Sequence, residues 1–181
     1  MPTPPTFVTG AVLTAAQMNT IGMHLVKTQT IGSAVSSVSV TSAFSSDYDV
    51  YRISISGCTY SVLDTTLLCR PGNISTASYF GGGFFQQYGT TTLSPLNWSS
   101  QTGGAVGITS TIPMSNIFDI TDPFISGRQK RMMGMFSLGG NFIALYGSVL
   151  TATGSYSDFS ISPASGTMTG GTIRVYGYRN S

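Results

Sequence analysis

The chain has 181 residues, of which only 8% are charged, and its formal net charge is +2. Globular domains usually carry about 25% charged residues, whereas this chain is dominated by 26 Ser, 24 Thr and 22 Gly. Helix-favouring Ala, Glu, Lys, Leu and Gln are scarce, which excludes a coiled coil or a helical bundle. All six acidic residues are Asp, and so few titratable side chains argue against most enzyme chemistries. We therefore expect a non-enzymatic all-β protein.

Residues 1–30 differ in character from the rest and are expected to form a separate N-terminal segment. Three prolines among the first five residues favour an extended arm. Thr14 is a suitable N-cap for a short helix from Ala15 to about Val26. Three helical turns are marginal alone in water, so this helix must pack on the domain or on a partner. Its apolar face comprises Met18, Ile21 and Leu25.

From Ile31 onward the apolar residues recur with period two, which is typical of strands. Tyr51, Ile53 and Ile55 are expected to face inward on one strand, and Ile173 and Val175 on the last. Gly139-Gly140-Asn141 is the strongest hairpin signal. Ten short strands without intervening helices predict an antiparallel β-sandwich of jelly-roll type over residues 31–181. The predicted strands are Val35–Val40, Tyr48–Ser56, Thr65–Arg70, Tyr79–Tyr88, Val106–Ile112, Asn116–Ile120, Lys130–Leu138, Phe142–Leu150, Phe159–Ser162 and Gly171–Tyr178.

No residue pattern in the sequence indicates a catalytic, cofactor or metal site. His24 is the only histidine and lies far in sequence from Cys58 and Cys69. The two cysteines are interpreted as small buried hydrophobic residues, with a disulfide across a hairpin as the alternative. The aspartates flanking Tyr48 lie at a strand entry, and Asp122 precedes a proline, so turn formation explains them.

Basic residues cluster only at Arg128, Lys130 and Arg131, which are too few for a nucleic-acid footprint. We expect this segment to be a solvated or interface loop. Residues 1–26 contain no Lys or Arg, whereas a coat protein that encloses a genome usually carries a basic arm. No apolar run approaches the roughly 18 residues of a membrane span, so no membrane insertion is expected.

Five aromatic residues surround a triple glycine, Gly81–Gly83, which we interpret as a flexible turn. Buried, these aromatics are core or subunit interface; exposed, they could stack on sugars or pack on a partner protein. Core or interface is the preferred interpretation, with a glycan site as the alternative. The five are Tyr79, Phe80, Phe84, Phe85 and Tyr88.

The charge deficit favours an assembly protein. An isolated domain would keep about 25–35% of its surface charged, and this chain has a mean hydropathy of +0.20. A surface of hydroxyls, glycines and aromatics can be covered by neighbouring subunits without desolvating charges.

Several stretches resemble virion proteins of tailed bacteriophages, especially fibre and minor tail proteins. Phe7–Asn19 is similar to their short N-terminal module, and Ser46–Ile53 to the strand that follows it. Asn116–Phe124 and the closing Thr172–Arg179 are similar to further stretches of the same group. The chain departs from a long fibre because it has no shaft repeats.

This resemblance implies a structural protein without catalytic residues or cofactors, assembled into virions in the bacterial cytoplasm. It implies a β-sandwich head displayed as a homotrimer and attached to the particle by the N-terminal segment. The expected partners are copies of the chain, other virion proteins of the tail or capsid, and a host surface glycan or protein. Capsid decoration or a head fibre is a close alternative, and a free carbohydrate-binding module a more distant one. The expected attachment residues are Phe7, Val8, Leu13, Met18, Ile21 and Leu25.

Overall fold

The computed structural model describes residues 22–138 and 142–179, together with residues 9, 10, 12 and 14. Every regular element in this part of the chain is a β-strand, and the strand pairs are antiparallel. The strands are β1 (Met23–Thr30), β2 (Val38–Val40), β3 (Tyr48–Tyr60), β4 (Thr66–Pro71), β5 (Tyr79–Gln87), β6 (Leu93–Gln101), β7 (Gly104–Ile108), β8 (Met114–Thr121), β9 (Lys130–Leu138), β10 (Phe142–Leu150), β11 (Phe159–Pro163), β12 (Met168–Thr169) and β13 (Thr172–Arg179).

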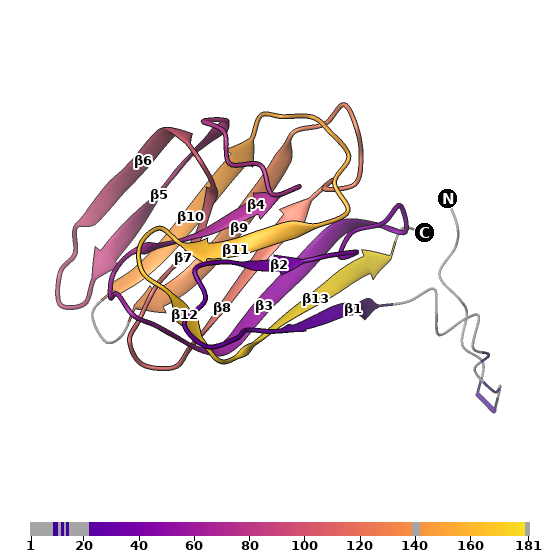
Figure 1. Ribbon diagram of the computed structural model, residues 1–181, viewed down its shortest axis with the longest axis horizontal. Helices are drawn as coiled ribbons and strands as arrows, with labels where there is room; N and C mark the ends of the chain where they lie inside the picture. Colours follow the sequence, from indigo (N-terminus) through magenta and orange to yellow (C-terminus); the bar gives the residue numbers. More distant parts are fainter. Residues whose placement is uncertain (1–8, 11, 13, 15–21, 139–141, 180–181) are drawn as a thin grey trace.

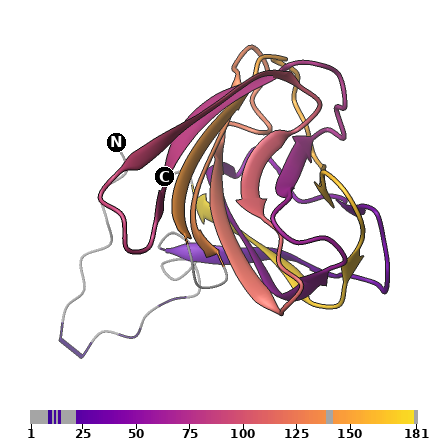
Figure 2. The same ribbon diagram turned by 90° about the vertical axis from the view of Figure 1, so that its left-hand side faces the viewer.

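The strands form two sheets that lie face to face, as in a sandwich. The larger sheet has nine strands in the order β1-β13-β3-β8-β9-β10-β5-β6, and β12 pairs with β3. The smaller sheet has four strands in the order β2-β11-β4-β7. Figures 1 and 2 show the smaller sheet lying against one face of the large, curved sheet. We call this covered face the inner face of the nine-stranded sheet and the opposite one its outer face.

The core lies between the two sheets and confirms the predicted alternation of inward side chains. Tyr51, Ile53 and Ile55 on β3 are fully buried, and so are Ile173 and Val175 on β13. The smaller sheet contributes other fully buried side chains: Val40, Leu67, Val106, Phe159 and Ile161. Burial of each such aliphatic or aromatic side chain stabilises the fold by roughly 1.5–3 kcal/mol.

Each of the ten predicted strands overlaps an observed strand. The predicted hairpin around residues 139–141 is consistent with the pairing of β9 and β10, which runs from Leu138 opposite Phe142 to Lys130 opposite Leu150. The turn residues lie outside the described part of the chain. The prediction missed β6. This strand contains Pro95, and proline within a run argues against a strand except at a sheet edge, which is where β6 lies. The prediction also missed the two-residue β12 and the whole of β1.

The predicted helix over residues 15–26 is wrong where the structure describes it, because Met23–Val26 belong to β1. Residues 15–21 lie outside the described residues. β1 pairs with β13, with Met23 opposite Tyr178 and Leu25 opposite Tyr176, and Val26 packs on the core. This pairing outweighs a helix preference that was marginal for so short a segment.

The two cysteines confirm the first interpretation, since both are free and fully buried. Cys58 lies on β3 and Cys69 on β4. Burial raises the pKa of both thiols above the ordinary value, so neither is a reactive thiolate at neutral pH.

A pair of glycines before β13 adopts positive φ angles, +66° at Gly170 and +88° at Gly171. A Cβ on Gly171 would lie 2.6 Å from the backbone oxygen of Ser56 and 2.7 Å from the backbone nitrogen of Cys58. These two residues flank a register shift in the pairing of β3 with β8. A Cβ on Gly170 would meet nothing within 4 Å. Gly171 therefore permits close backbone approach, whereas Gly170 only supplies a positive φ.

Substituting the two glycines separates these effects. Gly170→Ala should lower the free energy of unfolding by about 1–2 kcal/mol, the cost of a left-handed residue with a Cβ. Gly171→Ala should lower the free energy of unfolding by about 1–3 kcal/mol more than Gly170→Ala does, because the backbone of β3 must also shift. Urea unfolding of both variants beside the wild type measures the difference. Equal losses would contradict the close-approach role of Gly171.

Candidate functional site

The outer face of the nine-stranded sheet carries a continuous group of exposed apolar side chains. Six of them are between 43% and 65% exposed, and Leu145 is half-buried. They come from β5, β6, β8, β9 and β10, five strands that are neighbours in the sheet. We call this group the outer belt: Phe84, Leu93, Ile117, Met133, Met135, Ile143 and Leu145.

The sheet register explains why the outer belt is continuous. Met135 on β9 pairs with Leu145 on β10, Leu145 pairs with Phe84 on β5, and Phe84 pairs with Pro95 on β6. Neighbouring strands lie about 4.8 Å apart, so these side chains form one row across the sheet. Ile143 belongs to the next row along β10.

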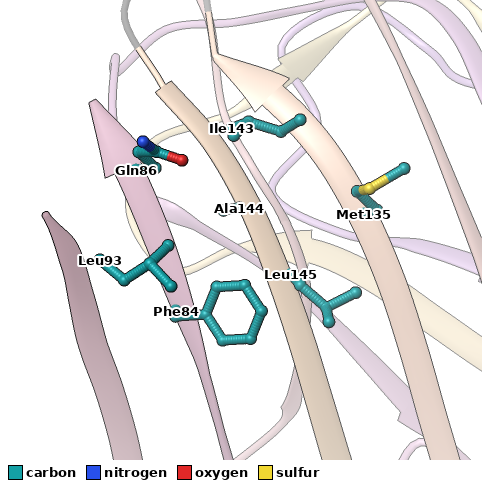
Figure 3. Close-up of a pocket in the computed structure, with 7 residues that line it drawn as sticks. All are labelled: Phe84, Gln86, Leu93, Met135, Ile143, Ala144 and Leu145. Carbon is teal, nitrogen blue, oxygen red and sulfur yellow. The ribbon is translucent and has the colours of Figure 1, made fainter. Parts of the chain in front are cut away.

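A shallow hollow of about 190 Å³ lies within the outer belt. Figure 3 shows its lining, in which Phe84, Leu93, Leu145, Met135 and Ile143 come from four strands and Gln86 is the one strongly polar member. A molecule that binds in the hollow would contact mainly apolar side chains.

An ion pair borders the outer belt on β3 and β8. Arg52 Nε donates to Asp119 Oδ1 and Arg52 Nη2 donates to Asp119 Oδ2, both at 2.8 Å. Asp119 lies opposite Met133 of the belt, and the guanidinium carbon of Arg52 lies 6.0 Å from the ring centroid of Tyr178. The hydrogen bonds to Asp119 raise the pKa of Arg52 above its ordinary value. Because the pair is partly exposed, it adds at most about 1 kcal/mol of stability, but it neutralises both charges beside the belt.

The five predicted aromatics divide between the two faces of β5 and the loop after it. Tyr79 is fully buried, and its hydroxyl donates to the backbone oxygen of Ile74 at 2.9 Å. Phe85 is half-buried and packs against a small cluster around Tyr146. Three remain exposed: Phe80 at 38%, Phe84 at 43% and Tyr88 at 55%. Tyr79 and Phe85 are therefore core residues, and Phe84 is the aromatic residue of the outer belt.

The triple glycine is not a turn, contrary to the sequence interpretation, because Gly81–Gly83 lie inside β5. A Cβ on Gly81 would come within 2.6 Å of Trp98 Nε1 on the neighbouring β6. Gly81 thus leaves space for the indole ring against the strand.

A second hollow of about 190 Å³ lies on the inner side, between β6 and the smaller sheet. Its lining includes Trp98 and Tyr146, whose rings meet edge to face with centroids 5.4 Å apart, and the polar Gln101 and Thr66. Trp98 Nε1 is buried and has no hydrogen-bond partner among the described residues. Burial raises the pKa of Tyr146 to about 12.

Of the predicted attachment residues, only Leu25 falls in the described part of the chain. It lies on edge strand β1, is 57% exposed and pairs with Tyr176. Phe7, Val8, Leu13, Met18 and Ile21 lie outside that part, so their role stays a prediction.

The three clustered basic residues do not form one exposed patch. Lys130 is fully buried; its Nζ donates to the backbone oxygens of Ile125 and Arg128. Arg128 pairs with Asp122 at 3.0 Å. Arg128, in the loop before β9 and 61% exposed at its side chain, and Arg131 on β9 are the two solvated charges of this cluster.

Nowhere in ranges 22–138 and 142–179 do three or more His, Cys, Asp or Glu side chains gather as metal ligands would. The same part of the chain contains no helix long and apolar enough to cross a membrane.

Sequence reasoning overlooked most of the outer belt, including Met133, Met135 and Ile117. The signal was present, because the strands concerned have apolar residues in both phases of the alternation. Met132 points inward and Met133 outward, just as Phe118 is buried and Ile117 exposed. Strands covered on both faces read as such unbroken apolar runs.

Comparison with known proteins does not identify the chain. No protein-family model and no curated protein sequence matches it. The tripod from the baseplate of bacteriophage Tuc2009 aligns with 99% of this chain and 76% of its own, at 13% identity and a TM-score of 0.23. A Shewanella oneidensis MR-1 protein of unknown function aligns over 95% and 97%, at 4% identity and a TM-score of 0.21. The infectious bursal disease virus Gx strain structure aligns over 88% and 41%, at 13% identity and a TM-score of 0.14. Scores this low carry no argument about fold or function.

The buried tyrosines predict a loss of stability at alkaline pH. Tyr146 ionises near pH 10 in the unfolded chain but at about 12 in the folded one. The unfolded state thus loses its proton first, and stability should fall as pH rises from about 10 toward 12. Tyr146→Phe should make this decline shallower by about 1–2 kcal/mol, measured by urea unfolding at pH 8 to 12. A decline as steep as in the wild type would contradict the assignment.

Proposed function

We propose that the chain is a non-enzymatic structural component of a bacteriophage particle, which assembles by burying its sheet surface against neighbouring subunits. The outer belt carries this proposal, because it exposes a contiguous apolar area on a chain with few charges. Contiguous exposed apolar patches typically mark interaction sites. The resemblance of four sequence stretches to tailed-phage virion proteins supports the particle as the place of assembly.

The low charge content of the surface suits a subunit of an assembly better than an isolated monomer. Only 8% of the residues are charged, and the Arg52–Asp119 pair neutralises two charges at the margin of the belt. Covering such a surface requires little desolvation of isolated charges, which is the main polar cost of forming an interface.

The more specific form of the proposal is a homotrimeric, tail-associated fibre or minor tail protein. Its N-terminal segment would attach it to the particle, and its sandwich would be displayed outward, where it could contact a host surface. This arrangement is supported by Leu25, the one predicted attachment residue among the described residues, which lies on edge strand β1 opposite Tyr176. A capsid decoration or head fibre is the close alternative, since it requires the same attachment and the same assembly.

A carbohydrate-binding role is a second candidate because of the inner hollow. Trp98 and Tyr146 provide aromatic surface, while Gln101 and Thr66 provide polar groups, a combination that sugar sites use. Glycan-array binding by the full chain that is lost in Trp98→Ala but kept in Met135→Asp would favour this role. No binding by the wild type would exclude it for the glycans tested.

Antibody labelling of purified phage particles tests the proposed function directly. Gold label on the tail is the expected result. Label confined to the shell would replace the tail assignment by the capsid alternative, and particles without label would overturn the proposal.

The attachment segment can be tested in the full chain by phage complementation. Phe7→Asp with Val8→Asp should reduce incorporation into particles at least tenfold, because two charges replace apolar side chains of the proposed attachment segment. Thr3→Asp with Thr6→Asp adds the same charge nearby and should have little effect. Incorporation is measured by quantitative blotting of purified particles, and equal loss in both variants would contradict the role of Phe7 and Val8.

A further inference from the structure

We propose that copies of this chain contact one another through the outer belt, so that this face is buried inside a homo-oligomer. The inference deepens the proposed function and rests on it for the premise that the chain assembles. It adds the surface through which assembly occurs and the partner, a second copy of the chain.

The first argument is the pattern of the strands beneath the belt. In β8, β9 and β10 the inward residues Phe118, Met132 and Tyr146 are buried by the fold itself. On the outer face β9 and β10 are apolar at Met133, Met135, Ile143 and Leu145, whereas β8 contributes Ile117 alone, beside the polar Asp119 and Thr121. Ile117, Met133, Met135 and Ile143 stay 43–65% exposed in the described structure. In β3, by contrast, the residues pairing across the outer face are Arg52, Ser54 and Ser56. Apolar residues in both phases are typical of strands covered on both faces, so the belt strands lack one cover.

The second argument is area. The belt extends over five adjacent strands and two to three residue rows, about 20 Å by 15–20 Å, or on the order of 350 Å². A stable interface buries about 800 Å² per partner, roughly 60% of it apolar. A patch of this size, whose apolar part is the seven belt residues, provides roughly 45% of the area that a stable interface buries on each partner.

The third argument is charge. A copy of the same face can approach the belt only if no uncompensated charge stands at its centre. Arg52 and Asp119, which border Met133, compensate each other through two hydrogen bonds of 2.8 Å. Arg131 lies at the end of the belt on β9 and can stay hydrated at an interface rim, where polar residues normally lie.

The fourth argument is that the sheet edges are poor alternatives. β6, one edge of the large sheet, contains Pro95, which cannot donate to an added strand. β1, the other edge, carries Lys27 and an irregularity between Leu25 and Lys27. In the smaller sheet, β2 has only three residues. Charges, prolines, bulges and short strands are the features that block edge-to-edge pairing, so the face is the favoured contact.

The test compares the mass of the full chain in solution with that of charged variants. The wild type should form an oligomer by light scattering, and Met133→Asp with Met135→Asp should shift it to a 19.0 kDa monomer. Leu63→Asp with Ile112→Asp adds the same charge at exposed apolar residues outside the belt, 51% and 61% exposed, and should leave the oligomer unchanged. Circular dichroism and thermal unfolding confirm that each variant is folded, as expected for side chains that are already 62% and 65% exposed.

Three outcomes would overturn the inference: a monomeric wild type at high concentration, an oligomer that persists in the belt variant, or equal dissociation in both variants. These results are independent of the particle labelling. An oligomer that resists the belt substitutions, in a protein found on particles, contradicts the inference alone. A belt-dependent oligomer that is absent from particles contradicts the proposed function alone.

Discussion

The stability of the structure depends on packing of the four-stranded sheet against one face of the nine-stranded sheet. The nine-stranded sheet is the wider of the two. Alternation along a strand sends successive side chains to opposite faces. A strand with apolar side chains on both faces therefore needs a packing partner on each face to bury them. The smaller sheet supplies the inner cover, where Ile53, Phe118 and Phe159 are fully buried. No second sheet among the described residues lies against the outer side of β9 and β10, where Met133 and Met135 are 62% and 65% exposed.

The two halves of the outer face have different chemistry. Toward β3 and β13 it presents serines, arginines and the Arg52–Asp119 pair beside Tyr176 and Tyr178, and the edge strand β1 adds the exposed Met23 and Leu25. Toward β9 and β5 it presents methionines and Phe84. Methionine adapts its shape to varied neighbours, so this half suits contact with another protein surface. Charged and hydroxyl side chains are thus concentrated on β3 and β13, and the outer belt lies on β8, β9, β10, β5 and β6.

The N-terminal region is connected to this sheet through β1. Its pairing with β13 runs from Met23 opposite Tyr178 to Thr30 opposite Thr172. A segment that holds the protein on a particle would therefore transmit force to the sheet through a ladder of backbone hydrogen bonds. A force along the strand direction acts on all the hydrogen bonds of such a ladder at once, so they resist separation together rather than breaking one at a time.

The sequence by itself determined the fold class and the inward residues of the main strands, because alternation and turn residues are local properties; Tyr51, Ile53 and Val175 were assigned correctly. It did not determine β1, whose strand state comes from pairing with β13, a contact with a distant part of the chain. Nor did it reveal the outer belt, although the residues were visible as apolar runs. Only the tertiary structure decided which face the smaller sheet covers and hence which apolar side chains of the described residues, Met135 among them, stay exposed.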